Sequence, residues 1–166
     1  MVNMRPFTAF EQKNLKFLVN HNVKFTQVEI TPTGLDKGIL DSTAPMRAYF
    51  LEEGVHDYSE QLQGQEFKQM RNAIILTADS QCITQASFYR PNTKKGDPRM
   101  WVYKLGSYTE GNDIHVLFYF ADKLYSINIT RIDIEKCYNS VIITPLKEVL
   151  MEINQIGNSV SEELIG

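Results

Sequence analysis

The sequence predicts a mixed α/β domain, in which helices flank a central mixed sheet. Segments with apolar residues at helical spacing alternate along the chain with segments rich in β-branched and aromatic residues. Turn residues separate these segments, most clearly at Thr31-Pro32-Thr33-Gly34. The length of 166 residues fits one domain over residues 1–166, and the content of 43% hydrophobic and 22% charged residues is ordinary for a globular chain.

The first predicted helix covers residues 8–20. We expect its polar residues Lys13, Asn14 and Lys16 to face solvent. Its apolar side comprises Phe10, Leu15, Phe17, Leu18 and Val19. A short helical turn is expected over 35–40.

Caps and prolines predict three further helices. They run from Ser42 or Thr43 to Gly54, from Pro98 (with Asp97 as N-cap) to about Gly106, and from Pro145 to about Ile156. Runs with high β-propensity predict strands over 23–30, 67–76, 82–89, 114–120 and 124–129, the last two joined as a hairpin.

Bulk charge and composition exclude several classes of protein. The net charge of −3 argues against a generic polyanion binder, because the domain of such a protein is usually basic overall. Any nucleic-acid surface is therefore expected to be a local patch. Cys82 and Cys137 lie far apart and are interpreted as free thiols. No apolar run approaches the roughly 20 residues that span a bilayer, and no signal peptide is recognisable, so we expect a cytoplasmic protein without membrane contact.

Asp57, Glu66 and Lys68 are the candidate catalytic residues. Two carboxylates, Asp57 and Glu66, can bind Mg²⁺, which prefers oxygen ligands and activates a bound water. This residue set suits metal-dependent cleavage of a phosphodiester. If Glu66 and Lys68 begin a strand, their side chains point to the same face, and the lysine neutralises the charge that develops on the phosphate being cleaved. The alternative is three unrelated surface charges.

Three nearby residues have competing interpretations. Asp41 is the main rival to Asp57 as the first carboxylate, and Glu29 is a reserve. His56 is interpreted as structural rather than catalytic.

A basic segment follows in the sequence. Arg90, Lys94, Lys95 and Arg99 fall within ten positions of an otherwise acidic protein and are the candidate DNA contacts. The alternative is a solvated loop without a ligand. Trp101 is expected to pack in the core rather than to stack on a base.

These segments resemble the PD-(D/E)xK nuclease superfamily, and more specifically type II restriction-endonuclease-like proteins of the MvaI/BcnI kind. The resemblance rests on four stretches: residues 30–37, 54–58, 65–68 and 89–101. It implies a restriction-endonuclease-like fold and Mg²⁺-dependent cleavage of double-stranded DNA. It also implies metal binding by Asp57 and Glu66, catalysis by Lys68, and DNA contacts by the four basic residues of the loop.

Two departures from the superfamily leave the function open. The proline that precedes the first aspartate is replaced by His56, and the chain is short for an enzyme that both recognises and cuts a duplex. The first hypothesis is therefore a restriction or defence endonuclease that acts as a homodimer or with a separate recognition domain. The second is a non-catalytic DNA-binding or effector module, and the third is a protein-interaction surface.

Overall fold

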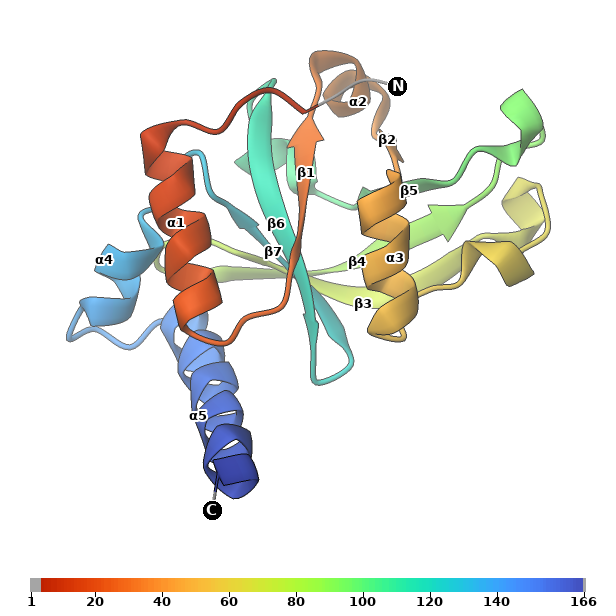
Figure 1. The fold of residues 1–166 in the computed structure, drawn as a ribbon. Helices are drawn as coiled ribbons and strands as arrows, with labels where there is room; N and C mark the ends of the chain where they lie inside the picture. Colours follow the sequence, from red (N-terminus) through yellow and green to blue (C-terminus); the bar gives the residue numbers. More distant parts are fainter. Residues whose placement is uncertain (1–3, 166) are drawn as a thin grey trace.

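The computed structural model describes residues 4–165, which form one curled mixed sheet flanked by helices (Figure 1). The strand order is β1-β6-β7-β3-β4-β5-β2, in which β3 and β7 run parallel and the other neighbouring strands of the described residues run antiparallel. The mixed sheet with flanking helices confirms the predicted fold class at this level. Because β1 and β2 are the two edges of the sheet, each pairs on one side only.

Strands β1, β3, β4, β6 and β7 follow the runs that the sequence predicts, with shifted ends, whereas β2 and β5 are not predicted as strands. Their bounds are β1 Thr26–Ile30, β2 Leu40–Asp41, β3 Gln69–Leu76, β4 Gln81–Tyr89, β5 Arg99–Val102, β6 Asp113–Phe120 and β7 Lys123–Asn128. Ala121 and Asp122 both have positive φ in the tight turn between β6 and β7, so the predicted hairpin is confirmed.

Five α-helices accompany the sheet: α1 Ala9–Asn20, α2 Pro32–Lys37, α3 Ala44–Glu52, α4 Ile134–Asn139 and α5 Pro145–Ile165. Thr8 and Glu11 form a reciprocal capping box at the start of α1. Thr31 caps α2 by accepting from the Gly34 backbone N–H, and Gly38 ends that helix with a φ of 65°. No helix among the described residues is long and apolar enough to cross a membrane.

Two apolar clusters lie on opposite sides of the sheet. One packs α3 against the inward side chains of β1, β3, β4 and β5, with Phe50 and Phe88 fully buried at its centre. The other packs α1, α4 and the first half of α5 against β6 and β7. The first cluster matters for the site, because it fixes α3 beside the loops that follow β4 and precede β3.

The predicted helix from Pro98 is wrong. Residues Arg99–Val102 form β5, which pairs with β4 and β2, and a 3₁₀ turn follows at Leu105–Tyr108. Met100 and Val102 alternate inward with period two, and the strand pairing outweighs the helix-start signal of Asp97-Pro98. Trp101 is half-buried against the edge of the core rather than central to it.

The predicted faces of α1 also need correction. Asn14 is buried and not solvent-facing, whereas Phe10 and Val19 are exposed. The Asn14 amide donates to the carbonyls of Ile129 and Ile132, 2.8 Å away in each case. A polar residue therefore occupies the buried side of the helix because it satisfies backbone groups of a distant loop.

Candidate nucleic-acid interface

Two loops extend from the same end of the sheet (Figure 1), and they carry the predicted site residues except Arg99, which begins β5, and the reserves Glu29 and Asp41. The first, which we call the acidic loop, covers 57–68 and joins α3 to β3. The second, the basic loop, covers 90–98 and joins β4 to β5. Their positions follow from the order of β3, β4 and β5 in the sheet.

Asp57 begins a 3₁₀ turn at Tyr58–Glu60. Its carboxylate accepts from the Ser59 backbone N–H at 3.0 Å and from the Ser59 hydroxyl at 2.6 Å. The residue is half-buried and lines a hollow between α3 and the basic loop. Asp57 therefore has a local structural role as a cap.

Glu66 and Lys68 do not begin a strand, so the prediction that they share one strand face is wrong. Glu66 is exposed in a second 3₁₀ turn, Gln65–Phe67, and β3 starts only at Gln69. The Glu66 carboxylate folds over Gly64, where a Cβ would lie 2.8 Å from it. The Lys68 Nζ lies 5.2 Å from the centroid of the Tyr89 ring, a cation–π contact.

Of the two predicted Mg²⁺ ligands, Asp57 lines a hollow beside α3, whereas Glu66 lines neither of the hollows described below. Lys68 does not line the hollow beside α3 either. Among the side chains that the structure describes, no group of three or more His, Cys, Asp or Glu is placed to hold a metal ion. We therefore derive no hydrolytic step from these residues.

Arg90 braces the two loops through its side chain. Its Nε donates to the Gly96 carbonyl and its Nη1 to the Gln61 carbonyl, both at 3.0 Å. The Arg90 carbonyl in turn accepts from the Gly64 N–H at 2.7 Å. One guanidinium thus joins the acidic loop to the basic loop, so that they form a single rigid projection.

Gln61 anchors the acidic loop from below. Its amide donates to the carbonyls of Phe67 and Phe88 at 2.9 and 2.8 Å, and its Oε1 lies 2.8 Å from the His56 Nε2. Because both amide hydrogens are used, the oxygen faces His56, which must donate through Nε2. Burial lowers the pKa of His56, and its ring stacks on Phe88, in agreement with a structural interpretation.

Gly96 allows the two loops to approach. Its φ is 72°, and a Cβ at this position would lie 2.6 Å from the Gln63 side-chain nitrogen. We expect Gly96→Ala to destabilise the basic loop by about 1–2 kcal/mol, because an L side chain is strained at this positive φ and the exposed Gln63 side chain must move aside. Hydrogen exchange of the loop amides should accelerate in the variant. Unchanged protection would contradict this close approach.

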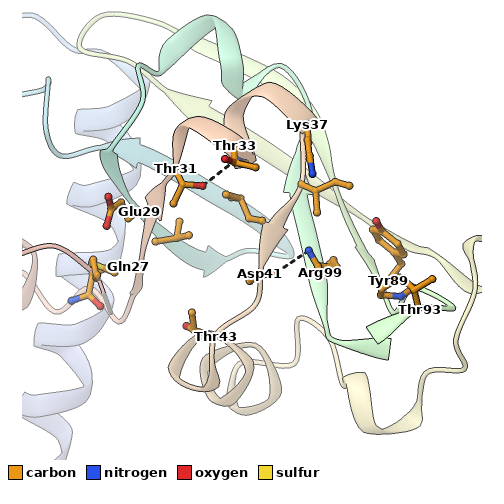
Figure 2. A pocket seen from close by; sticks show the side chains of 16 residues that line it. Gln27, Glu29, Thr31, Thr33, Lys37, Asp41, Thr43, Tyr89, Thr93 and Arg99 are labelled. Carbon is orange, nitrogen blue, oxygen red and sulfur yellow. Dashed lines mark hydrogen bonds and ion pairs between the residues drawn. The ribbon is translucent and has the colours of Figure 1, made fainter. Parts of the chain in front are cut away.

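The basic loop forms a ridge between two hollows. The hollow beside α3 (the helix hollow, about 430 Å³) is lined by Arg47, Arg90 and Lys95 together with Asp57 and Asp97. The hollow on the other side (the edge hollow, about 540 Å³) lies between edge strands β1 and β2. In Figure 2 the edge hollow has Gln27 and Glu29 along β1, and Lys37, Arg99, Tyr89 and Thr93 at the opposite end.

The four predicted DNA contacts have different environments. Lys95 is exposed, with a φ of 60° that turns the loop at its tip. Arg99 forms an ion pair with Asp41 on the neighbouring strand, with 2.9 Å between Nη1 and Oδ1. Arg90 is the brace described above. The Lys94 side chain lies outside the described parts of the chain.

Two basic residues at the hollows were not predicted. Arg47 comes from α3 and donates to the Ser42 carbonyl, and Lys37 comes from the last turn of α2. Each is an isolated charge in the sequence, more than 40 residues from the basic loop. No sequence pattern identifies them, because only the curled sheet brings them beside the ridge.

Comparison with known proteins gives no significant match: no family model, curated protein or solved structure is similar to the chain.

Proposed function

We propose that the protein is a non-catalytic module that binds double-stranded DNA through the basic-loop ridge. The observation that carries this proposal is the position of the ridge between two hollows that both contain cationic side chains. Arg47, Arg90 and Lys95 lie on one side, and Lys37 and Arg99 on the other. A DNA groove lies between two phosphate strands, so a ridge with cations on both flanks matches its charge pattern.

The local charge of the basic loop supports this proposal. The whole chain has a net charge of −3, yet residues 90–99 contain four basic side chains and one acidic side chain, Asp97. Phosphate contacts of this kind position a protein on DNA without reading the sequence. The braced loops also lower the entropic cost of ordering an interface, because Arg90 and Gln61 already hold them.

The competing hypothesis is a Mg²⁺-dependent endonuclease with a restriction-endonuclease-like fold. It requires Glu66 and Lys68 to join Asp57 at one metal ion, which the two 3₁₀ turns do not favour. Binding without cleavage therefore agrees better with the geometry.

A binding assay with matched lysine variants tests the proposal. Lys95→Ala should weaken binding of a fluorescent DNA duplex by about three- to tenfold at low salt. The slope of log binding constant against log salt concentration should become shallower by about 0.9, the change expected when one phosphate contact is lost. Lys16→Ala, the same change at an exposed site on α1, is the control and should leave both unchanged. Equal effects of the two variants, or no binding by the parent protein, would contradict a ridge-centred interface.

The same preparation separates binding from cleavage. Supercoiled plasmid with Mg²⁺ should remain intact at protein concentrations that saturate the duplex. Cutting that disappears in Lys68→Ala while duplex binding persists would instead support the endonuclease.

A further inference from the structure

Arg99 stands out among the charged residues because most of its hydrogen-bonding capacity is unused. A guanidinium has five N–H donors. Among the described residues, the one partner of this guanidinium is Asp41, through Nη1 at 2.9 Å, and the buried Nε has no partner. The Arg99 side chain is only 19% exposed, and its unpaired Nε is withdrawn from bulk water. Such a group is costly unless a ligand satisfies it.

The sheet fixes the position of Arg99 at the cationic end of the edge hollow. Arg99 pairs directly with Tyr89 on β4 and with Asp41 on β2, so the three side chains lie in one row across neighbouring strands. Its backbone carbonyl accepts from the Tyr58 hydroxyl at 2.8 Å, which holds β5 at this point. Lys37 and Thr93 complete this end of the hollow, away from Glu29 on β1 (Figure 2).

Asp41 occupies the place of an anionic ligand, but it is loosely held. Its side chain is 74% exposed, against 19% for Arg99, and a single Nη1–Oδ1 pair joins them. The Asp41 carboxylate neutralises part of the guanidinium charge. Because an ion pair with an exposed partner contributes little free energy, losing this pair would cost the protein little. A phosphate offers more acceptor oxygens and a bidentate fit, so it can displace the carboxylate.

We propose that the edge hollow is a phosphate-binding site in which Arg99 is the principal ligand, Lys37 and Thr93 assist, and Asp41 is a competing internal anion. The phosphate belongs either to the DNA backbone or to a free phosphorylated small molecule, which share this chemistry. The inference rests on the proposed function only where DNA is the source. The hollow of about 540 Å³ has room for a phosphate group with its substituent.

Asp41→Asn is the decisive variant, because the proposal predicts that this substitution increases the affinity for phosphate. Removing the competing charge while keeping the side-chain shape should tighten binding of inorganic phosphate, measured by titration calorimetry, by about three- to tenfold. Arg99→Gln should abolish phosphate binding, with circular dichroism confirming that the variant is folded. The same two variants are then measured with the DNA duplex.

The outcomes identify the source of the phosphate. Tighter binding of both probes by Asp41→Asn supports a site open to either source, whereas an effect on duplex alone assigns it to the DNA backbone. An effect on inorganic phosphate alone assigns it to a small molecule. If Asp41→Asn changes neither affinity, the proposed site is wrong. A persisting effect of Lys95→Ala would then still support DNA binding by the ridge, so the two failures are distinguishable.

Discussion

Replacing Glu11 by glutamine should lower the free energy of unfolding by about 3–5 kcal/mol, the cost of breaking a buried ion pair from one side. Glu11 is fully buried, and both its carboxylate oxygens accept from Arg5, at 2.8 and 2.6 Å. The Thr8 N–H and the Thr130 hydroxyl complete the set at 2.9 and 2.5 Å. The substitution leaves the Arg5 guanidinium without its counter-charge.

The pKa of Glu11 agrees with this expectation. Hydrogen bonds from Arg5 lower that pKa to about 2, although burial alone would raise it. The carboxylate also joins three separate parts of the chain: the N-terminal segment, the start of α1 and Thr130 beyond the end of β7. Its loss therefore loosens the attachment of α1 to the sheet.

Urea denaturation measures the effect, with Glu135→Gln as the matched control. Glu135 lies 3.6 Å from Lys13, and both side chains are 48% exposed. The same substitution at this exposed pair should cost about 0–1 kcal/mol. Similar losses in the two variants would show that the Arg5–Glu11 pair contributes no more than a surface pair.

Local sequence signals predicted much of the fold. The apolar runs of β3, β4, β6 and β7 and the prolines near the starts of α3 and α5 are signals that depend only on neighbouring residues. The helical turn expected over 35–40 instead begins at Pro32, as α2. The sequence predicts a helix where residues 99–102 form β5, because four residues show too little periodicity to distinguish a helix from a strand. Only the pairing of β5 with β4 and β2 decided it.

The buried polar residues and the site depended on distant partners. Asn14 lies on the side of its helix that is predicted to face solvent, but its partner Ile129 lies more than 100 residues away. Glu11 likewise has the distant partner Thr130. The spacing of Glu66 and Lys68 is compatible with either a strand or a turn. The turn is favoured by Gly64, whose φ of 123° ends the extended chain before Glu66. The basic run in the sequence marks Arg90, but its bracing role depends on the carbonyls of Gln61 and Gly96, which no local pattern identifies.

The contribution of His115 to the free energy of unfolding should fall by about 2–3 kcal/mol as the pH falls from about 8 to about 4.5. Its ring is fully buried, with the Ser126 hydroxyl 2.8 Å from Nδ1 and the Thr109 hydroxyl 2.8 Å from Nε2. The Thr109 hydroxyl donates to the Leu105 carbonyl, so Nε2 donates and the neutral ring is fully paired. Burial lowers the pKa of His115 from 6.5 to about 4.

The sign follows from the order of proton uptake. The unfolded chain protonates this histidine below pH 6.5 and the folded protein only below about pH 4, so the contribution is complete above 6.5 and is lost as the pH falls towards 4. Glu11 acts in a lower window, since its stabilisation is present above 4.5 and is lost towards pH 2. His56, whose pKa burial also lowers, adds to the loss in the same direction as His115. Urea denaturation across this range should show a shallower decline between about pH 6.5 and 4.5 in His115→Asn, because asparagine does not titrate, while its side-chain oxygen can take the place of Nδ1 beside Ser126. A variant that declines as steeply as the parent would assign the proton uptake to another group.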